Sequence, residues 1–285
     1  MDHPPAAPQP AHGGWHGREW LAEAAGTALL LLGGLSAVSL DFGAGSPVPR
    51  GIPSPSLRLL LTGLLFAGSG SLVAISPIGR LSGAHLNPAV TLSFWLQGKV
   101  SAADLGGYLA GQLTGAIGGV ALDRWLWGGT FTRAPVNWGR TVPRHGLQLA
   151  AAAGIELGMT AALILTIYAF LSRARTARWT PVATWVLIAC FVWQLAPYTG
   201  SSLNPVRSLA PDLLSARYPD WWIYLVAPLA GAGVATGLWA LVRSRHTLTT
   251  KMFHDPRFRS VMATSLPARP VVGGGRHDGA APDPG

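Results

Sequence analysis

Two copies of an Asn-Pro-small tripeptide lie within apolar stretches of the chain. The copies are Asn87-Pro88-Ala89 and Asn204-Pro205-Val206. Asparagine caps the free N–H groups at the start of a helix, and proline is favoured in the first helical turn. The pattern therefore predicts that a helix begins at each Asn inside a hydrophobic layer. Because the interior of a bilayer offers no hydrogen-bond partners, a helix end there must line a polar path. The two motifs together predict a pore.

Three charged side chains lie inside this apolar sequence. Arg207 comes three residues after Asn204, in the first turn of the predicted second helix. A permanently charged guanidinium there must face protein or water, so we expect it to line the pore. Glu23 and Glu156 are the only carboxylates well inside apolar runs. They could relay protons, or they could accept hydrogen bonds from the turn before each short helix. Their matching places in the two halves favour the structural role.

Other chemistry finds little support in the sequence. His85 could bind a metal, but no other His, Cys or acidic residue lies at ligand spacing, so a packing role is favoured. There is no hydrolase elbow, zinc signature or paired-carboxylate site, and we expect no catalytic residue, no metal and no cofactor. The single cysteine, Cys190, excludes a disulfide framework. The net charge of +9 lies mainly in loops and tails without a nucleic-acid-binding module, so no nucleic-acid partner is expected.

The composition is that of a protein embedded in a lipid bilayer. Hydrophobic residues make up 49% of the chain, and charged residues make up 12%, against about 25% charged in a typical soluble domain. Six apolar runs have the length that a membrane-spanning helix needs. They are Trp20–Leu40, Leu57–Ile75, Leu105–Leu126, Leu147–Leu171, Thr180–Ala196 and Trp221–Val242.

The segments that follow the two Asn-Pro pairs are shorter. They are Pro88–Gln97 and Pro205–Leu214, and ten helical residues reach roughly 15 Å, half of a bilayer core. Each half of the chain reads span, span, half-span, span, so the second half is inverted relative to the first. We therefore predict an all-α membrane protein with six transmembrane helices and two re-entrant half-helices in an inverted repeat.

The domain organisation follows from these segments. A channel domain is expected over residues 18–246, with repeats at about 18–128 and 145–246. Disordered tails are expected at 1–17 and 247–285.

The third span carries four glycines on one stripe, which predicts close approach of a neighbouring helix. They are Gly107, Gly111, Gly115 and Gly119. Arginines between the fourth and fifth spans favour a cytoplasmic position for that connection, although the long third-to-fourth connection carries arginines as well.

The two motifs, with Ser82-Gly83-Ala84-His85 before the first and Arg207 after the second, resemble those of the aquaporin and aquaglyceroporin family, the major intrinsic proteins. The resemblance covers about Arg18 to Arg245. It implies one pore per subunit, four subunits per assembly, cytoplasmic termini, and passive flow of small uncharged solutes without enzymatic chemistry. The abundance of Ala, Gly and Arg favours a bacterial source and hence a cytoplasmic membrane.

Elementary electrostatics indicates how such a pore passes neutral molecules and repels ions. If the side-chain oxygens of Asn87 and Asn204 cap their helices, their amide N–H groups are left to donate to a passing oxygen. Two positive helix ends at one point repel cations and protons. Backbone carbonyls before each Asn should form a ladder of acceptors, so that a neutral solute exchanges its hydrogen bonds with water for these. The ladder residues are Gly83, Ala84, His85, Gly200, Ser201 and Ser202.

The resemblance also implies a four-residue constriction near the outer mouth. Counting from the two motifs gives Ala67, Val192, Ser201 and Arg207. The first two are small or apolar where water-selective members usually carry an aromatic residue and a histidine, so a wider opening is expected. Together with Val206, this set is similar to that of plant members that carry metalloid acids. Ser208, however, stands where glycerol facilitators usually carry aspartate.

Several functions remain open on these grounds. The favoured one is a channel for water and small neutral solutes such as glycerol, urea or boric acid. A water-selective aquaporin is the nearest alternative. An ion-coupled transporter that uses Glu23 or Glu156, and a structural membrane protein with an incidental pore, are the others.

Overall fold

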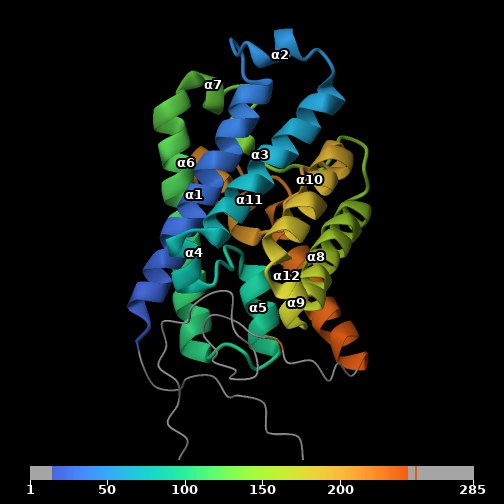
Figure 1. The fold of residues 1–285 in the computed structure, drawn as a ribbon. Coiled ribbons are helices and arrows are strands. Elements are labelled where there is room, and N and C mark those ends of the chain that lie inside the picture. The colour runs from blue at the N-terminus through green and yellow to red at the C-terminus, as the bar shows by residue number, and fades with distance from the viewer. Residues whose placement is uncertain (1–14, 243–247, 249–285) are drawn as a thin grey trace, which may run out of the picture.

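The computed structural model describes residues 15–242 and residue 248, and every regular element in that part of the chain is helical (Figure 1). The predicted tails fall almost entirely outside the described residues. At the N-terminal boundary, the first helix already begins at Gly17.

The two short helices after the Asn-Pro pairs are confirmed. They are α5, Pro88–Leu96, and α11, Pro205–Ser215. Six long helices occupy the six predicted spans, with ends within three residues of the expected ones. The long helices are α1 (Gly17–Phe42), α3 (Pro55–Ile75), α6 (Ala102–Trp127), α8 (Leu149–Leu171), α10 (Thr180–Thr199) and α12 (Trp221–Leu241).

Five short elements were not predicted. They are α2 (Val48–Gly51), α4 (Pro77–Ser82), α7 (Gly129–Thr132), the 3-10 turn η1 (Asn137–Gly139) and α9 (Ala174–Ala177). All of them lie in connections between the long helices, where hydrophobic periodicity carries no signal.

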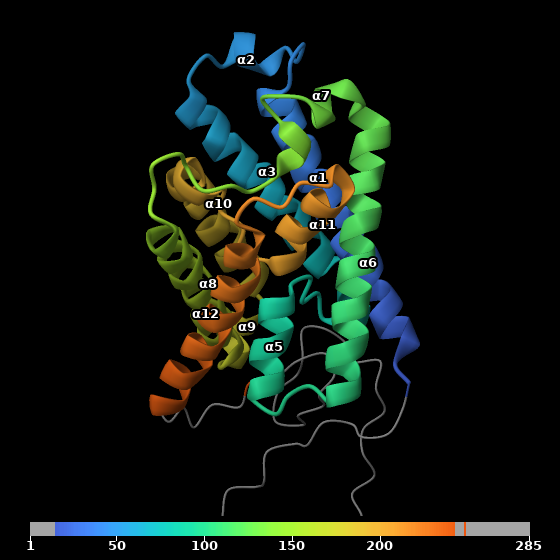
Figure 2. The same cartoon turned by 180° about the vertical axis from the view of Figure 1, so that it is seen from behind.

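Among the described residues, five long helices are apolar enough to cross a membrane by length and composition: α1, α3, α8, α10 and α12. Helix α6 has the length, at 26 residues, but its glycines and Gln112 lower its mean hydropathy. It nevertheless runs alongside α1 through the bundle (Figures 1 and 2). Low hydropathy here reflects a helix that is packed closely against a neighbour.

The glycine stripe of α6 makes that packing possible. A Cβ on Gly115 would lie 2.1 Å from the Ala24 carbonyl oxygen, and one on Gly119 would lie 2.6 Å from that of Ala28. A Cβ on Gly107 would collide with the indole ring of Trp20 at 2.2 Å. The stripe therefore lets the backbones of α1 and α6 touch, as predicted from its spacing.

The two halves of the chain run through the same order of elements: α1, α3, α5 and α6, then α8, α10, α11 and α12. Helices α5 and α11 lie inside the bundle at different levels (Figures 1 and 2). Helix α5 lies toward the end at which α1 begins, α12 ends and α9 is found. Helix α11 lies toward the end that carries α2 and α7.

Candidate functional site

The turns before α5 and α11 share one unusual backbone conformation. In each turn, the residues four, three and one positions before the Asn have positive φ angles. These are Gly83 (89°), Ala84 (50°) and Leu86 (53°), and Gly200 (84°), Ser201 (48°) and Leu203 (55°). Non-glycine residues rarely adopt this conformation. The repeat seen in the sequence therefore extends to the backbone of both turns.

Each Asn caps its own helix and also binds the opposite turn. The side-chain oxygen of Asn87 accepts from the Ala89 N–H at 2.8 Å, and that of Asn204 accepts from the Val206 N–H at 3.2 Å. The Nδ2 of Asn87 donates to the Leu203 carbonyl at 2.9 Å. These bonds bring the starts of two helices, far apart in sequence, to one place.

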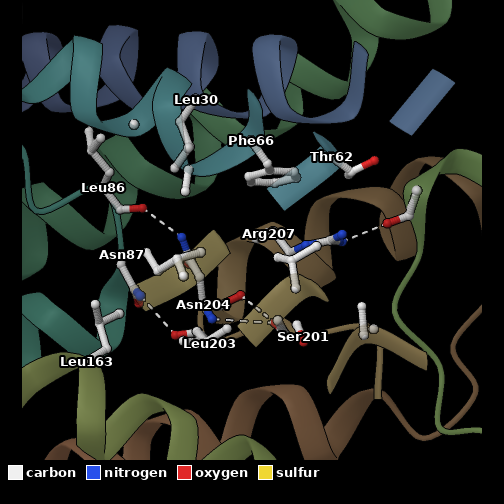
Figure 3. Close-up of a pocket in the computed structure, with 18 of the residues that line it drawn as sticks. Leu30, Thr62, Phe66, Leu86, Asn87, Leu163, Ser201, Leu203, Asn204 and Arg207 are labelled. Carbon is white, nitrogen blue, oxygen red and sulfur yellow. Dashed lines mark hydrogen bonds between the residues drawn. The ribbon is translucent and has the colours of Figure 1, made fainter. Parts of the chain in front are cut away.

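The reciprocal bond completes the pair, because Nδ2 of Asn204 donates to the Leu86 carbonyl at 2.8 Å (Figure 3). The sequence predicts that both amide groups are free to donate to a passing oxygen. In the structure each amide is already engaged in one bond. Each carries two hydrogens and one is engaged, so one N–H per Asn remains for a passing oxygen.

Two buried carboxylates hold these turns. Glu156 accepts from the backbone N–H groups of Ser202 and Leu203, both at 2.9 Å. Glu23 accepts from the backbone N–H of Leu86. Both acids are fully buried, and neither belongs to the lining of the cavity described next. Their bonds satisfy backbone donors that have no helical partner.

A cavity of about 380 Å³ runs past both motifs (Figure 3). Its lining includes all four predicted constriction residues and both asparagines. The predicted residues that line it are Ala67, Ala84, His85, Asn87, Val192, Gly200, Ser201, Ser202, Asn204 and Arg207.

The remaining predicted residues do not belong to this lining. Apart from the two acids, they are Gly83, Pro88, Ala89, Pro205 and Val206. Ala89 and Val206 instead lie in two different apolar clusters of the core. The small third residue of each tripeptide therefore anchors its half-helix in the protein.

Arg207 is held by the connection between α7 and α8. Its Nη1 donates to the Gly139 carbonyl at 2.6 Å, and the side chain is almost entirely buried. Gly139 has a φ of 63°, and a Cβ there would lie 2.5 Å from the Leu35 side chain. Glycine fits this place and a larger residue does not. The sequence predicts only a long loop here, and no motif in it points to a part in the site.

An aromatic ring lies against Arg207. The guanidinium carbon is 5.3 Å from the centroid of the Phe66 ring, which also lines the cavity (Figure 3). Gly34 on α1 makes room for the ring, because a Cβ there would lie 2.5 Å from it. Counting back from Asn87 predicts Ala67 as the constriction residue and gives no role to the adjacent Phe66. The cavity thus has an aromatic residue beside Arg207 that the motif spacing does not predict.

Two further bonds tie the same connection to α11. Arg140 Nε donates to Asp212 Oδ1 at 2.8 Å, and the Thr141 hydroxyl donates to Ser208 Oγ at 2.6 Å. Ser208 in turn lies 2.5 Å from the hydroxyl of Ser202. Ser208 is buried outside the cavity lining, so it supports the turn and does not contact a solute.

His85 lies within a small aromatic cluster. Its ring stacks on Phe94 with centroids 5.0 Å apart, and Nδ1 is 3.2 Å from the Thr91 hydroxyl. Within the part of the chain that the structure describes, no group of three or more His, Cys, Asp or Glu side chains could hold a metal ion. The surroundings of His85 are those of a packed side chain.

Comparison with known proteins gives one consistent result. The model of the protein family described as "Major intrinsic protein" matches residues 15–239. The lens fiber major intrinsic protein of Oryctolagus cuniculus is 33% identical over 200 residues, which cover 70% of this chain and 74% of that protein. The protein of the same name from Lithobates pipiens is 32% identical over 220 residues, covering 76% and 78%.

A solved structure matches as well. The X-ray structure of the aquaglyceroporin from Plasmodium falciparum superposes with a TM-score of 0.68. It covers 80% of this chain and 97% of that one at 24% sequence identity. At that identity the likeness concerns the fold, and it agrees with the helix order described above.

Proposed function

Since this chain belongs to the major intrinsic protein family, whose members are membrane channels for small solutes, we propose that it passes water and small uncharged solutes and excludes ions and protons. Glycerol, urea and boric acid are the solutes that we propose. Membership of this family also supports a function without enzymatic chemistry.

The observation that carries the proposal is the pair of reciprocal asparagine bonds. Nδ2 of Asn87 binds the Leu203 carbonyl and Nδ2 of Asn204 binds the Leu86 carbonyl, so the N-termini of α5 and α11 meet beside one cavity. Both helix ends carry partial positive charge, and both amides retain an N–H donor. A neutral molecule with an oxygen atom can accept such a bond, whereas a cation meets repulsion.

Arg207 adds a full positive charge to the same cavity. Its bond to Gly139 and its contact with Phe66 keep the guanidinium in place. A cation that approaches would lose hydration and face this charge as well as the helix ends. We propose that Arg207, together with Ala67, Val192 and Ser201, forms the selectivity constriction.

A water-selective channel is the second candidate, and one observation favours it. Phe66 places an aromatic ring against Arg207 and so occupies cavity space that Ala67 leaves open. A narrower opening would exclude glycerol by size and still admit water. Ion-coupled transport has less support, since Glu23 and Glu156 are bound to the turns and do not line the cavity.

Reconstituted vesicles decide between the two candidates. Protein in liposomes is exposed to gradients of glycerol, urea, boric acid or an impermeant osmolyte, and vesicle volume is followed by light scattering. A solute channel shows fast shrinkage followed by recovery with the permeant solutes. A water-selective channel shows fast shrinkage and no recovery. Shrinkage no faster than in empty vesicles would contradict both candidates.

Orientation and assembly are further proposals. One end of the bundle carries the beginning of α1, the end of α12 and the short helix α9 (Figure 1). Three arginines lie within or next to α9: Arg173, Arg175 and Arg178. By the positive-inside rule, we propose that this end is cytoplasmic. Two arginines at the opposite end have partners within the protein, Arg58 in the Asp41 carbonyl and Arg140 in Asp212, which reduces their weight in that rule. A homotetramer in a bacterial cytoplasmic membrane is proposed on the family resemblance and the composition.

A further inference from the structure

Two buried tyrosines bind the turns that precede the half-helices. Tyr108 on α6 donates its hydroxyl hydrogen to the Ser82 carbonyl, and Tyr224 on α12 donates to the Thr199 carbonyl at 2.7 Å. The two side chains are 0% and 1% exposed, and neither lines the cavity. Helices α6 and α12 are the last helices of the two repeats, and Ser82 and Thr199 each lie five residues before the Asn of their motif. The same contact therefore occurs once in each half of the chain.

Each tyrosine binds a peptide group whose other side is bound as well. The Gly83 N–H, which belongs to the same peptide group as the Ser82 carbonyl, donates to the Gly79 carbonyl at 2.7 Å. In the second turn, the Gly200 N–H donates to the Ala196 carbonyl at 2.9 Å. A planar peptide group that is bound at both its carbonyl and its N–H cannot rotate without breaking a hydrogen bond. The chain thus enters both turns through a fixed peptide group.

The peptide group that follows is fixed in the same way in the two turns. Gly83 has a φ of 89° and a ψ of 1°, and Gly200 has a φ of 84° and a ψ of −3°. The next N–H in each turn donates to a hydroxyl oxygen, that of Ser82 at 3.1 Å and that of Thr199 at 3.2 Å. Because the C=O and N–H of a trans peptide point in opposite directions, a bound N–H fixes the carbonyl of the preceding residue on the other side.

The predicted carbonyl ladder begins directly after the carbonyls that the tyrosines occupy. Within the described part of the chain, no group donates to the carbonyls of the three residues after Ser82 or of the three after Thr199. We propose that Tyr108 and Tyr224 are positioning residues of the channel, which fix the direction of these carbonyls by holding the peptide group that precedes them. The inference rests on the proposed function, in which a passing solute donates hydrogen bonds to the ladder.

Fixed carbonyls matter because a solute must pass from one to the next. A water molecule that leaves one carbonyl has to find another within hydrogen-bond distance, and the barrier rises by part of a lost bond if it does not. Phenylalanine in place of either tyrosine keeps the ring but offers no donor, so the first carbonyl of the turn is no longer held. No side chain of the cavity wall is changed, and the effect is expected in the rate of passage.

Tyr108→Phe and Tyr224→Phe test the proposal, one for each turn. The matched control is Tyr168→Phe, because Tyr168 is also 0% exposed but its hydroxyl donates to the Ser93 carbonyl within α5 at 2.8 Å, outside both turns. Ser82→Ala is a further variant of the first turn. It removes the hydroxyl that accepts from the second N–H of that turn and keeps Tyr108 in place.

The readout is osmotic water permeability per folded channel in proteoliposomes at several temperatures, with the melting temperature in detergent measured in parallel. We expect permeability to fall about two- to fivefold in Tyr108→Phe and in Tyr224→Phe, as for a barrier raised by at most one neutral hydrogen bond, with a steeper temperature dependence. Ser82→Ala should slow water in the same way, and it decides for the first turn if Tyr108→Phe gives no folded protein. Tyr168→Phe should keep the permeability and temperature dependence of the unmodified protein, whatever its melting temperature.

Two results would overturn the role of the tyrosines and leave the channel standing. A lower melting temperature with unchanged permeability per folded channel, in the variants of both turns, means that the hydroxyls only stabilise the fold. Equal slowing by Tyr168→Phe means that the loss of any buried hydroxyl has this effect. An unmodified protein that passes neither water nor solute refutes the proposed function, and the role of the tyrosines with it.

Discussion

Arg207 and Phe66 bring charge and bulk to one side of the cavity. The guanidinium faces the ring at 5.3 Å and is fixed by the Gly139 carbonyl. Aromatic faces attract cations, so the contact stabilises the orientation of Arg207. We propose that charge exclusion by Arg207 and size exclusion by Phe66 are coupled at this point. One substitution at each residue tests the two effects.

Arg207→Val should let small cations or protons leak while water flux persists. The substitution removes the fixed positive charge but leaves both helix N-termini and both asparagines in place. Planar-bilayer conductance and a pH-dye assay in vesicles measure the leak. Conductance equal to that of the unmodified protein would exclude Arg207 from charge selection.

Phe66→Ala should widen the cavity beside Arg207 and raise glycerol permeability relative to water permeability. The space beside Gly34 would be left unfilled, and because Phe66 is only partly buried, the change costs less than the about 3–5 kcal/mol of a fully buried ring. Folded yield must therefore be measured together with flux. A glycerol-to-water ratio that does not change in correctly folded protein would place the size filter at another residue.

Cys190 offers a further test of which side chains reach the pore. It is exposed on α10 and is absent from the cavity lining. We expect mercuric chloride to inhibit the unmodified protein poorly, and a cysteine introduced at Ser201, which lines the cavity, to confer block. Strong inhibition of the unmodified protein that a thiol reagent reverses would contradict this placement of Cys190.

The proposed function depends on the two half-helices, and Glu23 and Glu156 hold the turns that precede them. Each acid accepts backbone N–H groups that no helix satisfies. The turns in turn have a left-handed backbone at non-glycine residues such as Ala84 and Ser201, which is costly without such support. The shape of the cavity wall therefore depends on two residues that do not face it.

Glu156→Gln and Glu23→Gln should each lower the stability of the folded protein more than the permeability per channel. Both oxygens of Glu156 accept bonds, so an amide there leaves a buried donor unsatisfied, which costs about 1–3 kcal/mol. At Glu23 the bonds from Leu86 and Gln112 both reach Oε1, and the substitution weakens them by removing the negative charge. Thermal unfolding in detergent and flux divided by the number of folded channels give the two quantities. Normal stability with a new pH dependence of flux would instead indicate proton coupling.

The contact between α1 and α6 depends on glycines that leave room for the neighbouring backbone. Gly115→Val should destabilise the protein, because the added Cβ would lie 2.1 Å from the Ala24 carbonyl, which belongs to the backbone and cannot turn aside. Overpacking of this kind costs about 1–3 kcal/mol. Gly118→Val is the matched control, since nothing lies within 4 Å of a Cβ at that place. Equal stability of both variants would refute the close contact.

Considered as a whole molecule, the chain shows which features sequence patterns can predict. The Asn-Pro pairs, the half-helices and the α6 glycine stripe depend on local chemistry and on periodicity, so their places could be read from the sequence. The roles of Phe66, Gly139 and Arg140 could not be read from the sequence. Their roles depend on how the connection after α7 crosses the cavity, and its successive positive φ angles at Asn137, Trp138 and Gly139 follow no periodic pattern.

The central claim is that the junction of α5 and α11 forms a passive path for neutral molecules that is closed to charge. The most direct test measures osmotic water flux and proton flux in the same batch of proteoliposomes over a range of temperatures. We expect water flux far above that of empty vesicles, with a weak temperature dependence, and proton flux equal to that of empty vesicles. Water flux at the level of empty vesicles, or proton flux that rises with the amount of protein, would contradict it.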